Sequence, residues 1–228
     1  MTVALTSWEP YILPDLPAVP HTALERAVRD AAIDFCHDTL IWKEWLDRIS
    51  VVALDDDYSL TVPAAFTTYA AIEGVYQVYY KENGADDAQF TPLDPTTEDE
   101  MEAELGSSWM FNQAASPSKH YVPASEPTTL YLWPIPTLAS VSGVLVRAYF
   151  KPLQTATLLP DFLYNRHQNA IAFGAKSKLF GAKGMPWYDL KEQAKWLDLY
   201  NNERDNAIGA AMKGPIKKDQ TVRFRNWI

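Results

Sequence analysis

The stretch HTALERAVRDAAIDFCHDTLIWKEWLDRISVVAL, residues 21–54, decides the fold because the spacing of its apolar residues changes inside it. Its first part places apolar residues on one stripe of a helix: Leu24, Val28, Ala31, Phe35 and Trp42. Thr22 and Glu25 have the spacing of a capping box, which predicts that the helix starts there. The short β-branched run ISVVAL, which begins at Ile49, is typical of a strand.

Residues 49–152 are predicted to form an antiparallel β-sandwich or barrel-like insertion. They contain short runs rich in β-branched and aromatic residues: ISVVAL, YSLTVP, IEGVYQVYY, QFTPL, TLYLWPIP and GVLVRAYF. Turn-forming residues separate these runs, including Asp55–Asp57, Asn83-Gly84 and Ser142-Gly143. Between the runs, residues 95–106 are expected to form a short acidic helix, and residues 106–127 a long irregular loop.

Two further helices are predicted after the β region, over residues 158–182 and 186–214. The first carries apolar residues at helical spacing: Leu163, Tyr164, Ala170, Ile171, Gly174, Ala175 and Leu179. The second places Leu190, Ala194, Leu197 and Ile208 on one face. The predicted fold class is α+β: an antiparallel bundle of three main helices formed by residues 1–48 and 153–212, the β-rich insertion, and an extended C-terminal arm of residues 213–228.

The charge is divided unevenly along the chain of 228 residues, whose formal net charge is −9. From Pro160 onward there are 12 Lys and Arg against 7 Asp and Glu, whereas the preceding residues hold 8 against 22. Such asymmetry fits either contact with an anionic partner at one end or simple solubility. The single cysteine, Cys36, excludes an internal disulfide and suits a reducing compartment. Neither a signal peptide nor an apolar run long enough to span a membrane is predicted.

The stretch FGAKSKLFGAKG, residues 173–184, resembles a phosphate-binding loop because it is rich in glycine and lysine. A true phosphate loop follows a strand and precedes a helix, but this stretch lies inside a helical pattern and lacks G-x-x-x-x-G-K-[ST]. We expect Gly174 to allow close approach of another backbone, and Gly181 and Gly184 to end the helix. Lys176 and Lys178 are expected to lie off the packed face.

No other pattern predicts an enzyme, a metal site or a cofactor. The four histidines are scattered without ligand spacing, and there is no G-x-S-x-G. Cys36 and His37 are neighbours on a helix and point in different directions, so we expect Cys36 to be a core residue. Calcium binding by Asp55–Asp57 is possible in principle, but a hairpin turn explains these residues better because they lack D-x-D-x-D spacing.

An acidic segment stands out in the β region. Its six carboxylates are Asp94, Glu98, Asp99, Glu100, Glu102 and Glu104. No basic residue is interleaved, so a solvated face is predicted rather than an acid–base site. Trp109 and Trp133 in the same region could stack on sugar rings, which leaves a carbohydrate-binding β module as an alternative to core packing.

The order of elements, with AAIDFC and a tryptophan in the first helix, LPD-x-L opening the second, and KLFGAKGMPWYD ending it, resembles the head-to-tail adaptor (connector) proteins of tailed bacteriophages. The tail tubular A, or gatekeeper, proteins of short-tailed phages are the most similar. The resemblance implies a structural, non-enzymatic virion protein of the neck, assembled in the host cytoplasm. A stopper or tail-completion protein is the alternative within the same class.

The resemblance further implies a ring of about twelve subunits that docks under the portal protein. The β insertion would meet the tail nozzle or tail tube, and double-stranded DNA would pass through the lumen without specific binding. The C-terminal arm would bind the portal through basic and aromatic residues: Lys217, Lys218, Arg223, Phe224, Arg225 and Trp227. Acidic walls would keep the duplex from sticking, so we expect Asp94–Glu104 to lie near the lumen or the tail-facing surface.

Overall fold

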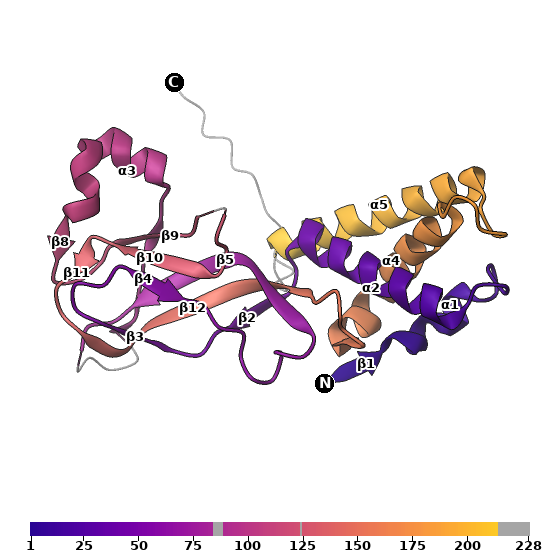
Figure 1. Ribbon diagram of the computed structural model, residues 1–228, viewed down its shortest axis with the longest axis horizontal. Helices are drawn as coiled ribbons and strands as arrows, with labels where there is room; N and C mark the ends of the chain where they lie inside the picture. Colours follow the sequence, from indigo (N-terminus) through magenta and orange to yellow (C-terminus); the bar gives the residue numbers. More distant parts are fainter. Residues whose placement is uncertain (84–88, 124, 214–228) are drawn as a thin grey trace, which may run out of the picture.

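The computed structural model describes residues 1–83, 89–123 and 125–213. Long helices lie at one end of an elongated molecule and the main sheets at the other (Figure 1). The α+β fold class is thus confirmed. The predicted arm lies outside the described residues apart from Lys213, which is the last residue of a helix. The division into a bundle of residues 1–48 and 153–212 and an insertion of residues 49–152 stays a prediction.

The first long helix, α2 (His21–Thr39), buries its predicted stripe, but both of its predicted ends are wrong. Pro20 is the N-cap, its carbonyl accepts from the N–H groups of Ala23 and Leu24, and no side chain caps the helix, so Thr22 is not part of a capping box. Leu40 ends the helix in the left-handed conformation, with φ of 48°. Trp42 is therefore outside the helix, although it is buried.

A short N-terminal segment precedes α2 and packs under the bundle. It consists of β1 (Thr2–Ala4), the 3-10 helix η1 (Leu5–Trp8) and α1 (Glu9–Ile12). Strand β1 pairs antiparallel with β13 (Leu158–Pro160), which leads directly into the next long helix. This pairing joins the N-terminus to the start of that helix.

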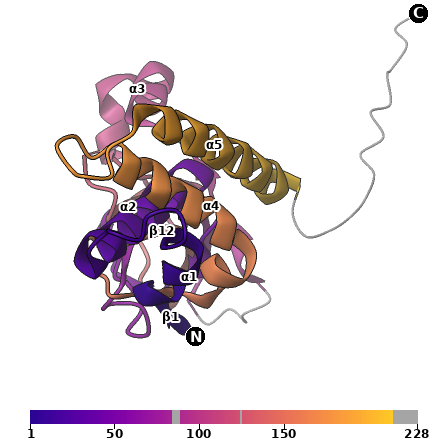
Figure 2. The same cartoon turned by 90° about the vertical axis from the view of Figure 1, so that its right-hand side faces the viewer.

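Helix α4 (Asp161–Phe180) packs against both α2 and α5 (Leu190–Lys213), and α5 lies on the outside of the group (Figure 2). Gly174 lies at a close contact, but with side chains and not with another backbone as expected: a Cβ there would lie 3.0 Å from the Tyr200 ring and 3.1 Å from the Cβ of Ala31. The glycine- and lysine-rich stretch thus lies at a helix–helix contact, and α4 ends with Gly181 as its C-cap.

Lys176 contradicts the prediction that it lies off the packed face. Its side chain is buried, it forms an ion pair with Asp15, and its Nζ lies 4.0 Å from the centroid of the Trp196 ring. Lys178, in contrast, is half-exposed and pairs with Asp34 of α2 at 2.6 Å. Both lysines therefore join α4 to its neighbours through ion pairs.

The apolar face predicted for α5 is wrong. Leu190 and Leu197 are 60% and 43% exposed, and Ala194 between them is exposed as well. The residues of α5 that face α4 and α2 are instead Trp196, Tyr200 and Ala207. The consequence is an apolar stripe on α5 that nothing within the described chain covers.

The larger sheet has the strand order β2 (Lys43–Trp45), β12 (Ser140–Pro152), β5 (Ala70–Tyr80) and β6 (Thr91–Pro92), and β3 (Ile49–Val51) also pairs with β12. Every pair in it is antiparallel. Alternate residues of β12, from Val144 to Phe150, are buried, while Leu145, Arg147 and Tyr149 lie on the other face.

The second sheet has the order β4 (Asp57–Ser59), β10 (Thr129–Trp133), β9 (Lys119–Tyr121) and β7 (Asp94–Pro95). The β7–β9 pair is parallel, as is a small pair of β8 (Gln113–Ala114) with β11 (Ile135–Pro136), so the pairing is not wholly antiparallel. Residues 106–127 were expected to be an irregular loop. They include the 3-10 helix η3 (Gly106–Phe111) and β9, which lies between two strands.

Helices and sheets share one apolar core. Trp42 shows this directly, because its ring lies within 5.6–6.3 Å of four others: Phe66, Tyr69, Phe150 and Phe162. Phe150 belongs to β12 and Phe162 to α4, so this aromatic cluster connects the two parts of the molecule. The same continuous core includes Leu130 and Leu132 of the second sheet.

Candidate interaction surfaces

The acidic segment forms a projecting helix, α3 (Glu98–Leu105), at the end of the molecule away from the long helices (Figure 1). Its N-terminus has the capping box that α2 lacks: the Glu100 N–H donates to Thr97 Oγ1 at 3.2 Å, and the Glu100 carboxylate accepts from the Thr97 N–H at 3.2 Å. Glu98 and Asp99 lie in the first turn, where the helix dipole favours negative charge.

An aromatic cluster holds α3 in place. Met101 is fully buried against Trp109, Tyr121, Tyr131 and Trp133, and the Trp133 indole N–H donates to the Trp109 carbonyl at 2.9 Å. Trp133 is almost fully buried, so it offers no open ring face for a sugar. The core-packing interpretation of the tryptophans is the one that the structure supports.

The sequence suggested that the acidic segment has no basic partner, but the structure shows one. Glu104 forms an ion pair with Lys119 of β9 at 2.9 Å, a contact between residues that are far apart in the sequence. Asp94 lies in β7, next to β9. The neighbouring His120 is buried, and this burial lowers its pKa to about 4, so it is neutral at pH 7. The remaining acidic residues of α3 face solvent.

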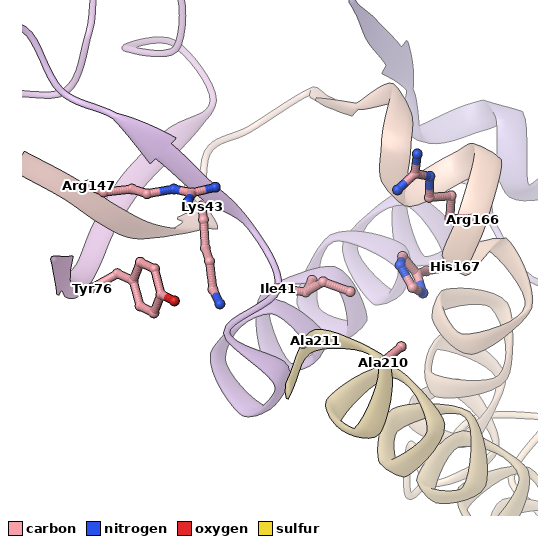
Figure 3. Close-up of a pocket in the computed structure, with 8 residues that line it drawn as sticks. All are labelled: Ile41, Lys43, Tyr76, Arg147, Arg166, His167, Ala210 and Ala211. Atoms are coloured by element: carbon pink, nitrogen blue, oxygen red, sulfur yellow. The ribbon is translucent and has the colours of Figure 1, made fainter. Parts of the chain in front are cut away.

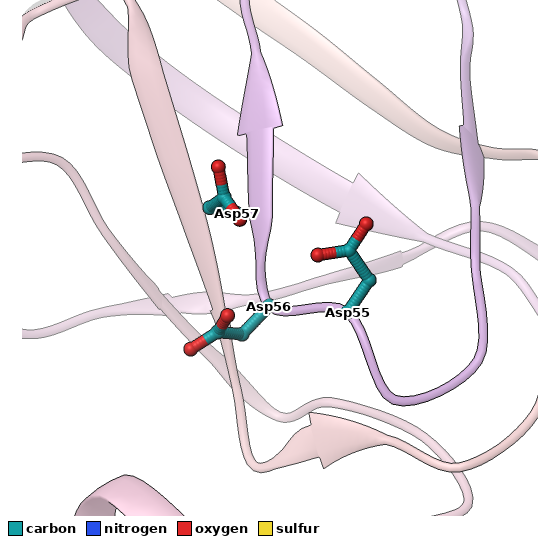
Figure 4. A group of neighbouring side chains, drawn as sticks. All are labelled: Asp55, Asp56 and Asp57. Atoms are coloured by element: carbon teal, nitrogen blue, oxygen red, sulfur yellow. The ribbon is translucent and has the colours of Figure 1, made fainter.

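The aspartate triplet Asp55–Asp57 lies at a turn between the two sheets and not in a hairpin (Figure 4). β3 pairs with β12 and β4 with β10, so the strands on either side of the turn are not partners. One carboxylate oxygen from each aspartate lies within 4.8 Å of the others, but the three carboxylates point in different directions. The Tyr58 hydroxyl donates to the carbonyls of Val52 and Asp55, which explains the turn structurally.

The contacts of His21, His37 and Cys36 indicate structural roles for these residues. His21 and His37 contact Glu9 and Glu73. Cys36 is fully buried, as expected, and burial raises the pKa of its thiol far above the usual range, so no reactive thiolate forms.

The uncovered stripe of α5, defined as Leu190, Ala194 and Leu197, continues into exposed apolar residues of the preceding loop, Met185 and Tyr188. Met185 also lines a mainly apolar groove of about 220 Å³ between α2 and the end of α4, whose lining includes Ala27 and Leu179 together with Arg26, Asp30 and Lys178. An exposed apolar patch of this kind, next to a groove of similar character, is typical of a protein–protein interface.

A second groove, of about 580 Å³, lies where the larger sheet meets the helices (Figure 3). Lys43, Tyr76 and Arg147 come from the sheet, and Arg166 and His167 come from α4. The last turns of α5 border it at Ala210 and Ala211. Three of these five side chains are cations at pH 7 and none is acidic, so the groove is basic.

Helix α4 departs from helical geometry at His167, whose φ and ψ are −128° and 21°. The His167 ring packs on Phe35 with 5.0 Å between centroids. Burial and the adjacent Arg166 lower the pKa of His167, which favours its neutral form. Sequence reasoning missed this groove because its side chains come from β2, β5, β12, α4 and α5, with no shared spacing.

The family model for the SU10 adaptor protein matches residues 5–223, which is nearly the whole chain. The chain belongs to the SU10 adaptor protein family. The resemblance to phage adaptor proteins is thereby confirmed at the level of the family, while this match does not extend to the tail tubular A proteins in particular. The comparison with curated proteins returns no match.

Membership in the SU10 adaptor family makes the chain a structural phage protein and a component of the virion neck. Such adaptor proteins interact with portal and tail components, and the family is not enzymatic. Among the described residues, no helix is both long and apolar enough to cross a membrane. The roles predicted for the acidic segment and for the arm stay predictions, and the arm residues lie outside the described residues.

Proposed function

We propose that this SU10 adaptor protein forms a ring, of twelve subunits as in the tail tubular A proteins it resembles, that docks under the portal, joins it to the tail and lets DNA pass during ejection. The observation that supports assembly into a ring is the uncovered stripe of α5. A ring needs a heterologous contact between two different surfaces of the same chain. The stripe of one copy and the groove between α2 and α4 of the next are the two different apolar surfaces that such a contact would join.

The first test is the mass of the assembly. We expect the purified protein, mixed with the portal protein of the same phage, to form a complex that contains several copies of the chain. Native mass spectrometry gives the number of copies directly. A chain that stays monomeric in the presence of assembled portal would contradict the proposed function.

Deletion of residues 214–228 is expected to abolish portal docking and to leave the fold intact. The deleted segment carries Lys217, Lys218, Arg223 and Arg225, and the core residues of the described chain lie between Val3 and Ala207. Portal binding by size-exclusion chromatography and the melting temperature check the two parts of this prediction. Docking by the shortened chain at wild-type affinity would exclude the arm as the portal contact.

Charge reversal on α3 tests the proposed position of the acidic segment at the lumen or the tail-facing surface. The variant combines Glu98→Lys, Asp99→Lys and Glu102→Lys, and it keeps Glu100 because that side chain completes the capping box. If α3 lines the lumen, the added cations bind phosphates, and DNA ejection from assembled particles slows. Unchanged packaging and ejection, with the helix still folded by circular dichroism, would exclude a lumen position.

A further inference from the structure

The groove between the larger sheet and the helices carries stacked cations and aromatic rings. Lys43 Nζ lies 4.2 Å from the centroid of Tyr76 and 5.4 Å from that of Tyr149. The Arg147 guanidinium carbon lies 5.5 Å from the centroid of Trp45 and 5.6 Å from that of Tyr76. These contacts fix the two cations on the outer face of the sheet, and Tyr76 and Trp45 remain 45% and 43% exposed.

The cations of this groove have no carboxylate partner within the described chain. Lys43, Arg147 and Arg166 form no ion pair with any residue in ranges 1–83, 89–123 and 125–213. The Nε of Arg147 is also buried without a hydrogen-bond acceptor. Residues 1–159 contain 22 acidic and only 8 basic residues, so two unpaired cations placed side by side on one face are unusual. The hydrogen-bond donors of these side chains therefore lack acceptors among the described residues, and a bound partner would supply them.

The groove fits a short acidic protein segment better than it fits DNA. Its volume of about 580 Å³ suits a few side chains. Tight duplex binding, in contrast, uses about 6–10 phosphate contacts, and the acidic half of the chain would repel the remaining phosphates. Arginine and tyrosine on a rigid sheet are typical anchors of protein interfaces, and carboxylates provide the acceptors that both cations require.

The position of the groove indicates which protein brings that segment. Ala210 and Ala211 at its border lie one turn before the end of α5, and the basic residues 213–228 follow immediately. The groove and the arm therefore begin at the same place and have the same charge. We propose that the groove is a second portal-docking site, which binds a carboxylate-rich segment of the portal while the arm binds elsewhere on it. This inference rests on the proposed portal docking.

The test compares portal binding by the full chain and by two groove variants, Lys43→Met and Arg147→Gln. Both keep most of the side-chain length over the rings and remove the charge. We expect each to weaken binding to the portal of the same phage by about tenfold, and the double variant by more. Raising the salt concentration should weaken the wild type more than the double variant, because the lost contacts are electrostatic.

Arg48→Gln is the matched control, since Arg48 is an exposed arginine that lines neither this groove nor the one between α2 and α4, and it undergoes the same substitution as Arg147. It should bind portal like the wild type. Wild-type affinity of the double variant, with the arm deletion still abolishing docking, would overturn the groove proposal and leave the proposed function standing. Loss of binding to a short DNA duplex, with portal affinity unchanged, would also overturn it, because the groove would then be a nucleic-acid site.

Discussion

Replacement of Trp42 by alanine is expected to lower the free energy of unfolding by about 3–5 kcal/mol, the usual cost of truncating a large buried aromatic side chain. Trp42 is almost fully buried and its ring contacts Phe66, Tyr69, Phe150 and Phe162. Two of these belong to the larger sheet and to α4, so the cavity would open between the sheet and the helices. Chemical denaturation monitored by circular dichroism measures the loss.

Because the sheet and the helices share this core, the Trp42→Ala variant should still unfold in a single transition. Trp45→Ala is the control, since Trp45 is 43% exposed on the outer sheet face and should cost much less. Two separate unfolding transitions in the wild type, with the Trp42 variant affecting only one of them, would show that the two parts do not share a cooperative core.

The long helices and most strands could be predicted from the sequence because their periods are local properties. The stripe of α2 and that of α4 are buried where the 3.6-residue spacing placed them, and the run from Ile72 to Tyr80 lies in β5. Strand β9 was missed because only three residues, Lys119–Tyr121, form it, between proline-containing segments. So short a strand has no measurable alternation, and pairing on both sides stabilises it instead.

The ends of α2 show a different limit. Thr22 and Glu25 have capping-box spacing, but the N-cap is Pro20, so the helix begins two residues earlier. At the other end, the apolar Trp42 continued the helical period although Leu40 had already ended the helix. Capping-box spacing and an apolar residue at helical spacing do not fix where a helix begins or ends. The backbone conformation at Pro20 and at Leu40 fixes both ends of α2.

The candidate surfaces were harder to predict than the fold. The cations of the groove, Lys43, Arg147 and Arg166, come from β2, β12 and α4 and meet only in the folded chain. The acidic segment was evident from composition, but its ion pair between Glu104 and Lys119 and its anchor Met101 depend on tertiary contacts. Composition thus located a charged surface where the charges are consecutive and missed one where they are dispersed.

The face of α5 is the most informative error. Leu190, Ala194 and Leu197 have the spacing of a core stripe, and periodicity does not distinguish a face that is buried within the chain from one that is buried between chains. Trp196 and Tyr200 occupy the position towards α4 instead. A stripe that residues 1–83, 89–123 and 125–213 leave uncovered fits the proposed ring, in which a second copy would cover it.

The combined substitution Leu190→Gln and Leu197→Gln is therefore expected to reduce sharply the number of copies bound per portal. If the stripe of one copy packs against the groove between α2 and α4 of the next, each copy on the portal stabilises its neighbour, and polar side chains remove that contribution. Stability of the isolated chain should change by no more than about 0.5 kcal/mol, because both leucines face solvent there and glutamine is a good helix former. Native mass spectrometry counts the bound copies.

Leu199→Gln is the matched control for the stripe. Leu199 is also an exposed leucine of α5, but it lies nine residues from Leu190 and hence on the opposite side of the helix. Its substitution should leave portal occupancy unchanged. If both variants filled the portal like the wild type, the subunits would be held by the portal alone, and the stripe would have to face another component of the neck. Reduced occupancy with the stripe variant only would place the contact between neighbouring copies on that side of α5.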